Sequence, residues 1–268
     1  MGYLTAVMAF VIWGFTSTVV LRAVPLAGPV ASEVGFLAGS AIMLAVIGPK
    51  RWREVAALVR QHPWRLAGLA AAFAGCSLTY QWSVKSTTVA NAVLTHSFQP
   101  ILTCLLFLPL MGAARPTRKG YGALALGMGG LAVLLWPQLS WNGMSFMSVW
   151  GLALGTASAA FFAWYNVQLP FFEKLAKPDI LQTSVTLVAT VILLPALAFA
   201  GPVEFDVRGA SATIAFCVLN FAVANILYFR AVRRIPIGHL ATLAYVEPVV
   251  SIVAASIFLG EPMTAGVL

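Results

Sequence analysis

The residues best suited to chemistry lie in two matching stretches of the chain. Glu247 is followed directly by Pro248, Gln99 is followed by Pro100, and both pairs stand inside apolar runs. A charge in the middle of a hydrocarbon layer costs ~2.5–3.5 kcal/mol, so Glu247 is expected to face a cavity, to pair or to be protonated. Three roles stay open for this carboxyl: fixing a helix kink, contacting a substrate, or carrying a proton.

The two prolines are expected to break the helices that carry them. A proline removes one backbone hydrogen bond and frees the carbonyl four residues earlier, here at His96 and Ala244. Such breaks are tolerated at membrane depth only beside protein or a water-filled cavity. Pro100 and Pro248 are therefore predicted to be gating hinges that face each other across a cavity.

His96 belongs to an unusually polar stretch. Asn91, Thr95 and Gln99 share one helical face, and His96 borders that face. A small shift of its pKa would make a histidine a proton carrier. An interhelical hydrogen bond and a place in the wall of a cavity are the other roles that stay open.

Aromatic side chains with polar tips recur in several of the apolar runs. Such residues can enclose an amphipathic solute by burying its apolar body, whereas core packing is the alternative role for each of them. The predicted substrate-binding residues are Trp13, Thr16, Tyr80, Gln81, Asn91, His96, Gln99, Trp164, Tyr165, Asn225, Tyr228, Tyr245 and Glu247.

Composition decides which elements must position these residues. Of the 268 residues, 60% are hydrophobic and only 9% are charged, and the mean hydropathy is +0.91. Continuous apolar runs of about 20 residues predict membrane-spanning helices rather than a barrel. The fold class is therefore an all-α polytopic membrane protein. The expected spans are 3–21, 28–48, 66–84, 88–111, 120–136, 148–170, 180–200, 209–229 and 236–259.

The chain also repeats itself. A shift of 148 positions superimposes Phe73 on Phe221, Tyr80 on Tyr228 and Pro100 on Pro248. Because the first copy has five spans, the second must lie inverted in the membrane, an arrangement that places a binding site at the midplane. The predicted units are a five-helix repeat over 1–136, a periplasmic linker over 137–147, and a second repeat over 148–268. The tenth helix is expected to be missing or truncated.

Basic residues predict the orientation. With a cytoplasmic N-terminus, thirteen of the sixteen Lys and Arg residues fall in inner loops. The net charge of +8 thus fits a multi-pass protein of the inner (plasma) membrane better than one that binds nucleic acid. Residues 50–65 predict a short interfacial helix. Glu33, in the outer part of the second span, is expected to pair with Arg22 or Lys85.

Motifs for catalysis and for cofactors are absent. No HExxH, GxSxG or phosphate-binding loop occurs, and the cysteines have no metal-ligand spacing. We therefore expect no metal, no cofactor and no enzyme activity. The expected partners are a small-molecule substrate and membrane lipids, and the choice between a monomer and a homodimer stays open.

Three segments carry a resemblance to a known family. They are AFVIWGFTS at residues 9–17, YQWSVKSTTVAN at 80–91 and AYVEPVVSIVAASIFLGEP at 244–262. In order and spacing they resemble the ten-span EamA-type exporters of the drug/metabolite transporter superfamily, over essentially the whole chain. One departure is Gly35, where the family often has an arginine. The resemblance implies a carrier of small metabolites, commonly amino acids or their relatives, moved outward.

The sequence thus predicts a secondary transporter that works by alternating access between the two repeats. A proton-coupled importer of sugar-like solutes and a passive channel are alternatives within transport. An intramembrane lipid-modifying enzyme, with His96 and Glu247 as acid and base, is the alternative from another class.

Overall fold

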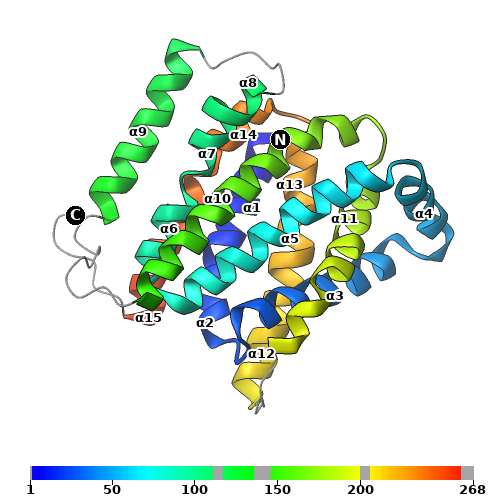
Figure 1. The fold of residues 1–268 in the computed structure, drawn as a ribbon, viewed down its shortest axis with the longest axis horizontal. Helices are drawn as coiled ribbons and strands as arrows, with labels where there is room; N and C mark the ends of the chain where they lie inside the picture. Colours follow the sequence, from blue (N-terminus) through cyan, green and yellow to red (C-terminus); the bar gives the residue numbers. More distant parts are fainter. Residues whose placement is uncertain (1, 111–116, 136–145, 200–205, 261–268) are drawn as a thin grey trace.

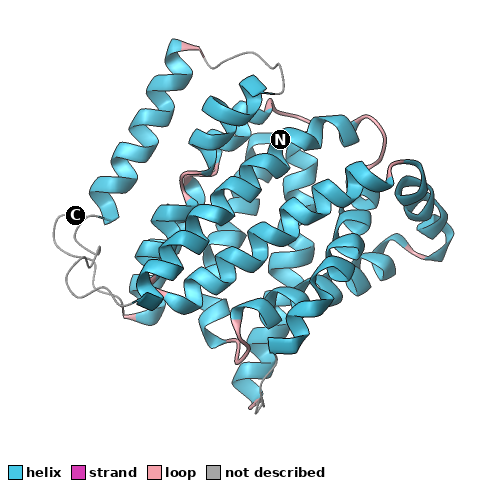
Figure 2. Cartoon of the chain, viewed as in Figure 1, coloured by secondary structure: helices cyan, strands magenta, loops and turns pink. Residues whose placement is uncertain are grey.

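Helices make up the regular structure of the chain. A computed structural model describes residues 2–110, 117–135, 146–199 and 206–260, and within these ranges it contains helices and turns but no strand (Figure 2). Most of the predicted linker over 137–147 lies outside the described residues, which include only its last two positions. The residues of the Gly-Glu-Pro motif after Gly260 and the expected start of a tenth helix also lie outside the described residues.

Along the described residues the chain makes nine helical passes (Figure 1). Single helices form four of them: α3 (Gly28–Ile47), α5 (Pro63–Ser86), α9 (Arg118–Leu135) and α10 (Phe146–Glu173). The others are interrupted or change pitch: α1 (Gly2–Phe15) to α2 (Leu21–Ala23), α6 (Val89–His96) through α7 (Gln99–Ile101) to α8 (Leu108–Leu110), α11 (Pro178–Leu193) with a 3-10 turn over Leu194–Phe199, α12 (Val207–Phe216) to α13 (Ala224–Val232), and α14 (Ile237–Leu243) to α15 (Val246–Leu259).

Six of these passes are long and apolar enough to cross a membrane. The predicted all-α polytopic membrane fold is confirmed, with passes at all nine expected positions. Prolines and glycines set several of the helix ends. Pro63 and Pro178 occupy the first turns of α5 and α11, where a missing N–H costs nothing. Gly48 and Gly260 end α3 and α15 at φ values of 74° and 67°, which other residues rarely adopt.

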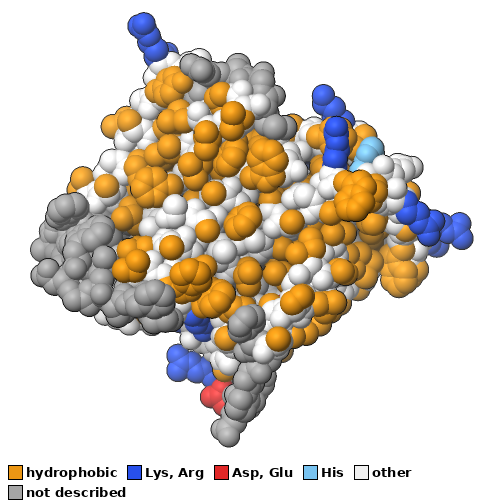
Figure 3. Space-filling view, in the orientation of Figure 1, with side chains coloured by type: hydrophobic (Ala, Val, Ile, Leu, Met, Phe, Trp, Pro, Cys, Tyr) orange, Lys and Arg blue, Asp and Glu red, His pale blue; other side chains and the backbone are white. Residues whose placement is uncertain are grey.

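The surface matches a hydrocarbon environment. On the face shown in Figure 3, hydrophobic side chains cover the middle of the molecule, and Lys and Arg gather toward its margins. Large apolar side chains such as Leu126, Val133 and Ile257 are mostly exposed. Water would penalise a contiguous apolar surface of this kind, whereas lipid tails do not.

The helix contacts form two like sets. Helix α1 packs against α13 and α15, and α10 packs against α5 and α6. Under the shift of 148 residues, the pass that begins with α1 corresponds to α10, α13 corresponds to α5, and the pass of α14 and α15 corresponds to the pass of α6 to α8. The corresponding pairs of passes are therefore in contact in both sets. The boundaries of the repeats, 1–136 and 148–268, stay a prediction.

The loop after α3 carries the expected short helix. Helix α4 (Trp52–Gln61) buries Val55 and Leu58 and exposes its polar residues, and the indole nitrogen of Trp52 donates to the Leu44 carbonyl at 3.0 Å. The sequence did not predict its link to the second half of the chain. Arg51, just before α4, forms an ion pair with Asp179 at the start of α11, and its Nε lies 3.0 Å from Glu54.

The expected ion pair of Glu33 is not formed, so this prediction is wrong. The Arg22 guanidinium donates to the Thr87 carbonyl, and the Lys85 ammonium donates to the Val24 carbonyl at 2.9 Å. Both carboxylate oxygens of Glu33 are buried and have no hydrogen-bond partner among the described residues. Backbone carbonyls at loops satisfy the two cations locally, so neither has to reach into α3.

Glycines in α3 allow a close helix contact, as the Gly35–Gly39 pair predicts. A Cβ atom on Gly35 would lie within 2.6 Å of three atoms of the Phe221 ring, and one on Gly39 would lie 2.9 Å from the Phe221 Cβ. The Phe221 ring cannot swing aside easily, because it packs edge-on against Phe36 and Phe216 at centroid distances of 4.8 and 5.5 Å.

We expect Gly35→Ala to destabilise the protein by about 1–3 kcal/mol through overpacking against Phe221. The matched control is Gly130→Ala, since nothing lies within 4 Å of a Cβ at that position. Both changes gain the same helix propensity, ~1 kcal/mol. The measurement is the midpoint of thermal unfolding in detergent, and equal midpoints for the two variants would contradict the packing described here.

Candidate functional site

A central cavity lies among passes from both halves of the chain. It encloses about 60 Å³, which is room for a few water molecules but less than the ~300–1,000 Å³ typical of pockets that hold a drug-sized ligand. Helices α1, α5, α6, α10 and α15 and the π-helical segment Cys217–Val223 supply its walls. The lining residues are Trp13, Ser17, Phe73, Cys76, Ser77, Tyr80, Gln81, His96, Phe162, Asn220, Phe221 and Glu247.

A smaller proline cavity adjoins the central one and encloses about 10 Å³. Tyr80, His96 and Glu247 line both cavities. The further lining residues of the proline cavity are Val93, Ser97, Gln99, Pro100, Ala244, Tyr245, Pro248 and Ser251. Pro100 and Pro248 thus both line one space rather than facing the lipid, and their role as gating hinges stays a prediction.

Each proline follows a turn that interrupts its pass. The helices break at residues 97–98 and at 244–245. The Phe98 N–H donates to the Thr95 carbonyl at 3.4 Å, and the Glu247 N–H donates to the Ala244 carbonyl at 3.1 Å. The expectation that Pro248 frees the Ala244 carbonyl is therefore wrong in one respect: a tighter turn satisfies that carbonyl, and no neighbour has to do so.

The backbone around Glu247 is fixed by contact with α1. The Ser251 hydroxyl lies 2.9 Å from the Glu247 carbonyl and 3.1 Å from the Gly14 carbonyl. A Cβ on Gly14 would come within 2.6 Å of the Glu247 carbonyl oxygen, so only glycine permits this approach. These contacts hold a carboxyl that is 7% exposed at the wall of both cavities.

His96 is held between three helices. Its Nδ1 lies 2.8 Å from the Ser158 hydroxyl, and its ring packs against Tyr80 at a centroid distance of 4.5 Å. The Ser158 hydroxyl also lies 2.7 Å from the Gly155 carbonyl. When the single hydroxyl hydrogen of Ser158 is on that carbonyl, Ser158 accepts from Nδ1 of His96, and Nε2 of the neutral ring is a hydrogen-bond acceptor.

The π-helical segment Cys217–Val223 is tied to two other passes through its carbonyls. The Asn220 carbonyl accepts from the Trp13 indole at 3.1 Å and from the Asn225 amide at 2.8 Å. The Phe221 carbonyl accepts from the Gln182 amide at 3.3 Å. Wide turns of this type often occur at functional sites, and here the turn brings Asn220 and Phe221 to the central cavity.

A second polar chain links the proline cavity to α13. The Tyr228 hydroxyl donates to the Asn166 side-chain oxygen, and the Asn166 amide donates to Gln99 at 3.3 Å. Tyr228 also packs against Trp13 at a centroid distance of 5.0 Å. Gln99, at the break in the fourth pass, is thus held by α10.

The structure divides the predicted substrate-binding residues into three groups. Those that line one or both cavities are Trp13, Tyr80, Gln81, His96, Gln99, Tyr245 and Glu247. Those that lie behind the walls are Thr16, which donates to Asn220 at 2.8 Å, and Asn225, Tyr228 and the fully buried Tyr165. Those that lie elsewhere are Asn91, which donates to Thr87, and Trp164, which is 38% exposed beside Phe107.

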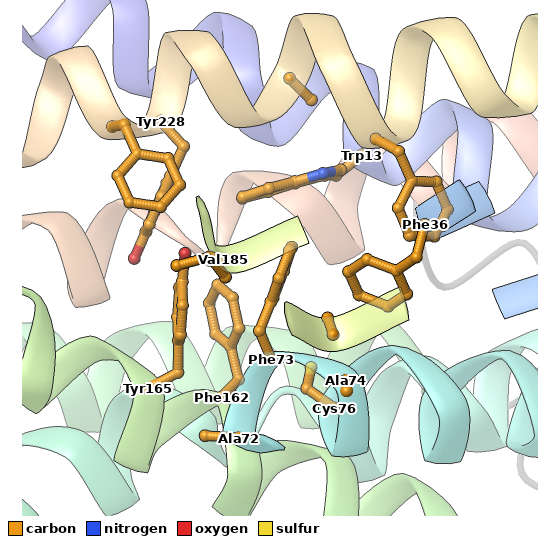
Figure 4. Close-up of a cluster of buried hydrophobic side chains, with 14 of the residues drawn as sticks. Trp13, Phe36, Ala72, Phe73, Ala74, Cys76, Phe162, Tyr165, Val185 and Tyr228 are labelled. Carbon is orange, nitrogen blue, oxygen red and sulfur yellow. The ribbon is translucent and has the colours of Figure 1, made fainter. Parts of the chain in front are cut away.

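Sequence reasoning did not single out several of the lining residues. They are Ser17, Phe73, Cys76, Ser77, Phe162, Asn220, Phe221 and Ser251. Figure 4 shows how the aromatic ones meet: the rings of Tyr228 and Trp13 face those of Tyr165, Phe162 and Phe73. One signal was present, because Phe73 and Phe221 match under the 148-residue shift. Among the described residues no three His, Cys, Asp or Glu side chains gather as metal ligands.

Comparison with known proteins finds a family match in the second half of the chain. Residues 149–267 match the model of the EamA-like transporter family. A solved structure, described only as the crystal structure of a protein, superimposes with a TM-score of 0.77 at 20% sequence identity, covering 99% of this chain and 91% of that one. At this identity the likeness concerns the fold alone. No curated protein matches the chain.

We expect Asn166→Leu to destabilise the protein by about 1–3 kcal/mol, because Gln99 loses a buried donor and Tyr228 loses an acceptor. Gln168→Leu, two residues along α10, is the control. Among the described residues, its amide donates within its own helix, to the Trp164 carbonyl at 3.4 Å. Thermal unfolding in detergent measures both variants, and a loss in Gln168→Leu as large as that in Asn166→Leu would refute the role given to the polar chain.

Proposed function

We propose that this protein is a secondary transporter of small metabolites, amino acids or related amphipathic solutes, and that it works by alternating access. One observation carries the proposal. Glu247 and His96 line two adjoining cavities deep in the bundle, between two helix breaks that face each other. An acidic group is rare inside membrane spans and marks a pathway for a substrate or an ion. The EamA-like transporter match of residues 149–267 supports the same reading.

The chemistry of the cavity favours an amphipathic cation-bearing solute. Glu247 offers a carboxylate to an ammonium group, and Nε2 of a neutral His96 offers an acceptor. Trp13, Phe73 and Phe162 supply aromatic faces for an apolar body and for a cation. An amino acid combines these features. Sugar-like solutes would use the hydroxyl and amide groups of the wall but would leave the carboxylate without a charged partner.

The size of the cavity favours a moving site over an open channel. At about 60 Å³ the central cavity is too small for an amino acid, so helices must separate before a solute enters. At residues 97–98 and 244–245 the regular helical hydrogen bonding is already interrupted by turns, so two passes can bend there more easily than a continuous helix could. We infer that repeats 1–136 and 148–268 rock about these breaks.

The distribution of basic residues supports a cytoplasmic N-terminus and a location in the inner membrane. In the sequence, thirteen of the sixteen basic residues fall in the loops on one side of the predicted spans, so we assign that side and the N-terminus to the cytoplasm. We place the protein in the inner membrane, with outward movement of the solute as the physiological direction.

We expect Glu247→Gln to weaken binding of a cation-bearing solute about 10- to 100-fold, because a charge-assisted hydrogen bond worth ~1.5–3 kcal/mol is lost. A thermal-shift screen of amino acids and related metabolites identifies the ligand, since a bound ligand stabilises the folded state. Flux of that ligand is then measured in proteoliposomes. Glu54→Gln, the same chemical change on exposed α4, serves as the control.

Two outcomes of that experiment would count against parts of the proposal. Unchanged affinity in Glu247→Gln would exclude contact between this carboxyl and the solute. Full flux driven by a pH gradient in the same variant would exclude Glu247 as the proton carrier. Chemical turnover of a lipid in detergent, without solute flux in sealed vesicles, would favour the enzyme alternative instead.

We expect Pro100→Ala and Pro248→Ala to slow flux more than they weaken binding, because a continuous helix resists bending at the cavity. Pro63→Ala is the control, as Pro63 lies in the first turn of α5, where no intrahelical bond is missing. Flux in proteoliposomes is compared with the ligand-induced rise in unfolding temperature. Parallel loss of both quantities in the Pro100 and Pro248 variants would contradict a hinge role.

A further inference from the structure

The charged groups at the walls of the two cavities are one-sided. Glu247 lines both cavities, and its carboxyl group forms neither a hydrogen bond nor an ion pair with any described residue. No Lys or Arg side chain of the described ranges lines either cavity. A solute that binds here therefore meets an unpaired acid and no permanent cation.

The basic residues of the chain are placed elsewhere. All Lys and Arg residues except Arg115 belong to the described part of the chain. Lys85 follows Gln81 of the central cavity by one helical turn, yet its ammonium donates to the Val24 carbonyl at 2.9 Å. Arg22 likewise donates to the Thr87 carbonyl at 3.0 Å. Both of these cations are thus bound to backbone at the ends of their helices, and neither pairs with Glu247.

His96 is the remaining base among the lining residues that are described. Its ring packs against Tyr80 and Phe162 at centroid distances of 4.5 and 6.0 Å, and its Nδ1 lies 2.8 Å from the Ser158 hydroxyl. With Ser158 as the acceptor for Nδ1, the Nε2 atom of the neutral ring accepts a hydrogen bond. Such a ring serves an ammonium group, which has only donors, and offers nothing to a carboxylate.

The polar and aromatic parts of the walls give a bound solute a direction. Tyr80, His96 and Glu247 line both cavities, so they form a polar junction where the two adjoin. The aromatic rings that line the central cavity include those of Trp13 and Phe162, which meet edge-on at a centroid distance of 6.0 Å (Figure 4). A cationic end therefore fits at the junction, and an apolar body fits among the rings.

This placement works against a carboxylate on the same solute. In an α-amino acid the carboxylate and the ammonium group share one carbon, so an ammonium bound to Glu247 brings the carboxylate within about 6 Å of the Glu247 carboxylate. Like charges at that range repel much more strongly in the protein interior than in water. Asn220 and Gln81 offer neutral amides at the wall, which solvate a carboxylate without cancelling its charge. An amine leaves the complex neutral, whereas an amino acid leaves an excess negative charge inside the membrane.

We propose that the site selects amphipathic amines that lack a carboxylate over the corresponding amino acids, and that Glu247 sets this preference. The inference rests on the transport function proposed above and narrows its substrate class. Within the group of amino acids and related solutes, it assigns tight binding to the amines.

The test compares three probes that share one aromatic body: phenethylamine, phenylalaninamide and phenylalanine. The first two carry an ammonium group alone, and phenylalanine adds the carboxylate. Dissociation constants are measured by isothermal titration calorimetry on the whole protein in detergent at about pH 6.5, below the ordinary pKa of an α-amino group. We expect similar affinities for phenethylamine and phenylalaninamide. Phenylalanine should bind about 100-fold more weakly, because its buried carboxylate has no cation as a partner.

A variant assigns the preference to one carboxyl group. Glu247→Gln should weaken the binding of phenethylamine about 10- to 100-fold and that of phenylalanine much less, so the preference shrinks. The matched control is Glu54→Gln on α4, which should keep the preference of the wild type. The comparison of probes on the wild-type protein decides the question by itself where the Glu247 variant does not fold.

Three outcomes would overturn the inference: equal affinities of the wild type for phenylalanine and phenylalaninamide, a preference that Glu247→Gln leaves unchanged, or no binding of any of the three probes. If phenylalanine binds as tightly as its amide and moves in proteoliposomes, the proposed transport function stands and the selectivity for amines fails. Absence of flux for every solute that the thermal-shift screen identifies would instead contradict the transport function itself.

Discussion

Hydrocarbon offers no hydrogen-bond partner to a broken helix, so every interruption of this bundle has to be satisfied from within the protein. The widened turn at residues 217–223 meets the requirement with side chains: Trp13 and Asn225 reach the Asn220 carbonyl, and Gln182 reaches the Phe221 carbonyl. The break before Pro248 meets it with a tight turn. Polar side chains therefore collect where helices are irregular, and that is where the cavities lie.

The same bonds set the resistance of the bundle to opening. Among the bonds that join the turn at 217–223 to other passes are those from Trp13, from Thr16 and from Gln182. Interhelical hydrogen bonds in membranes average ~0.6 kcal/mol each, so together they hold the passes by about 2 kcal/mol. A free-energy difference of this size would keep one arrangement dominant, and the second arrangement that we propose would stay within reach of a ligand's binding energy.

Local sequence patterns were sufficient to predict the spans, the proline breaks and the polar fourth pass, because length, hydropathy and proline chemistry are local properties. The same patterns could not predict which aromatic residues of α10 point into the bundle. Trp164 and Tyr165 are neighbours in the sequence, yet Trp164 is 38% exposed and Tyr165 is fully buried. In a soluble helix polar residues mark the outer face, but lipid accepts apolar side chains on every face, so periodicity cannot tell which residue points inward. Asn220 was missed for a related reason: a π-helical turn shifts the face of each later residue.

The chemistry of the site arises from departures from the internal repeat. Phe73 and Phe221 match under the 148-residue shift, and both line the central cavity. Gln99 and Glu247 match as well, but α10 donates a hydrogen bond to the Gln99 side chain through Asn166, whereas the contacts of α1 with Glu247 among the described residues involve the Glu247 backbone. The neutral member of the pair is therefore tied by its side chain, and the acidic member keeps its carboxyl at the cavity wall. A strictly symmetric pair would present either two carboxylates, which repel each other, or none. With a tethered amide at one position, a single acidic side chain remains at the proline cavity, which fits the cation-bearing solute that we propose.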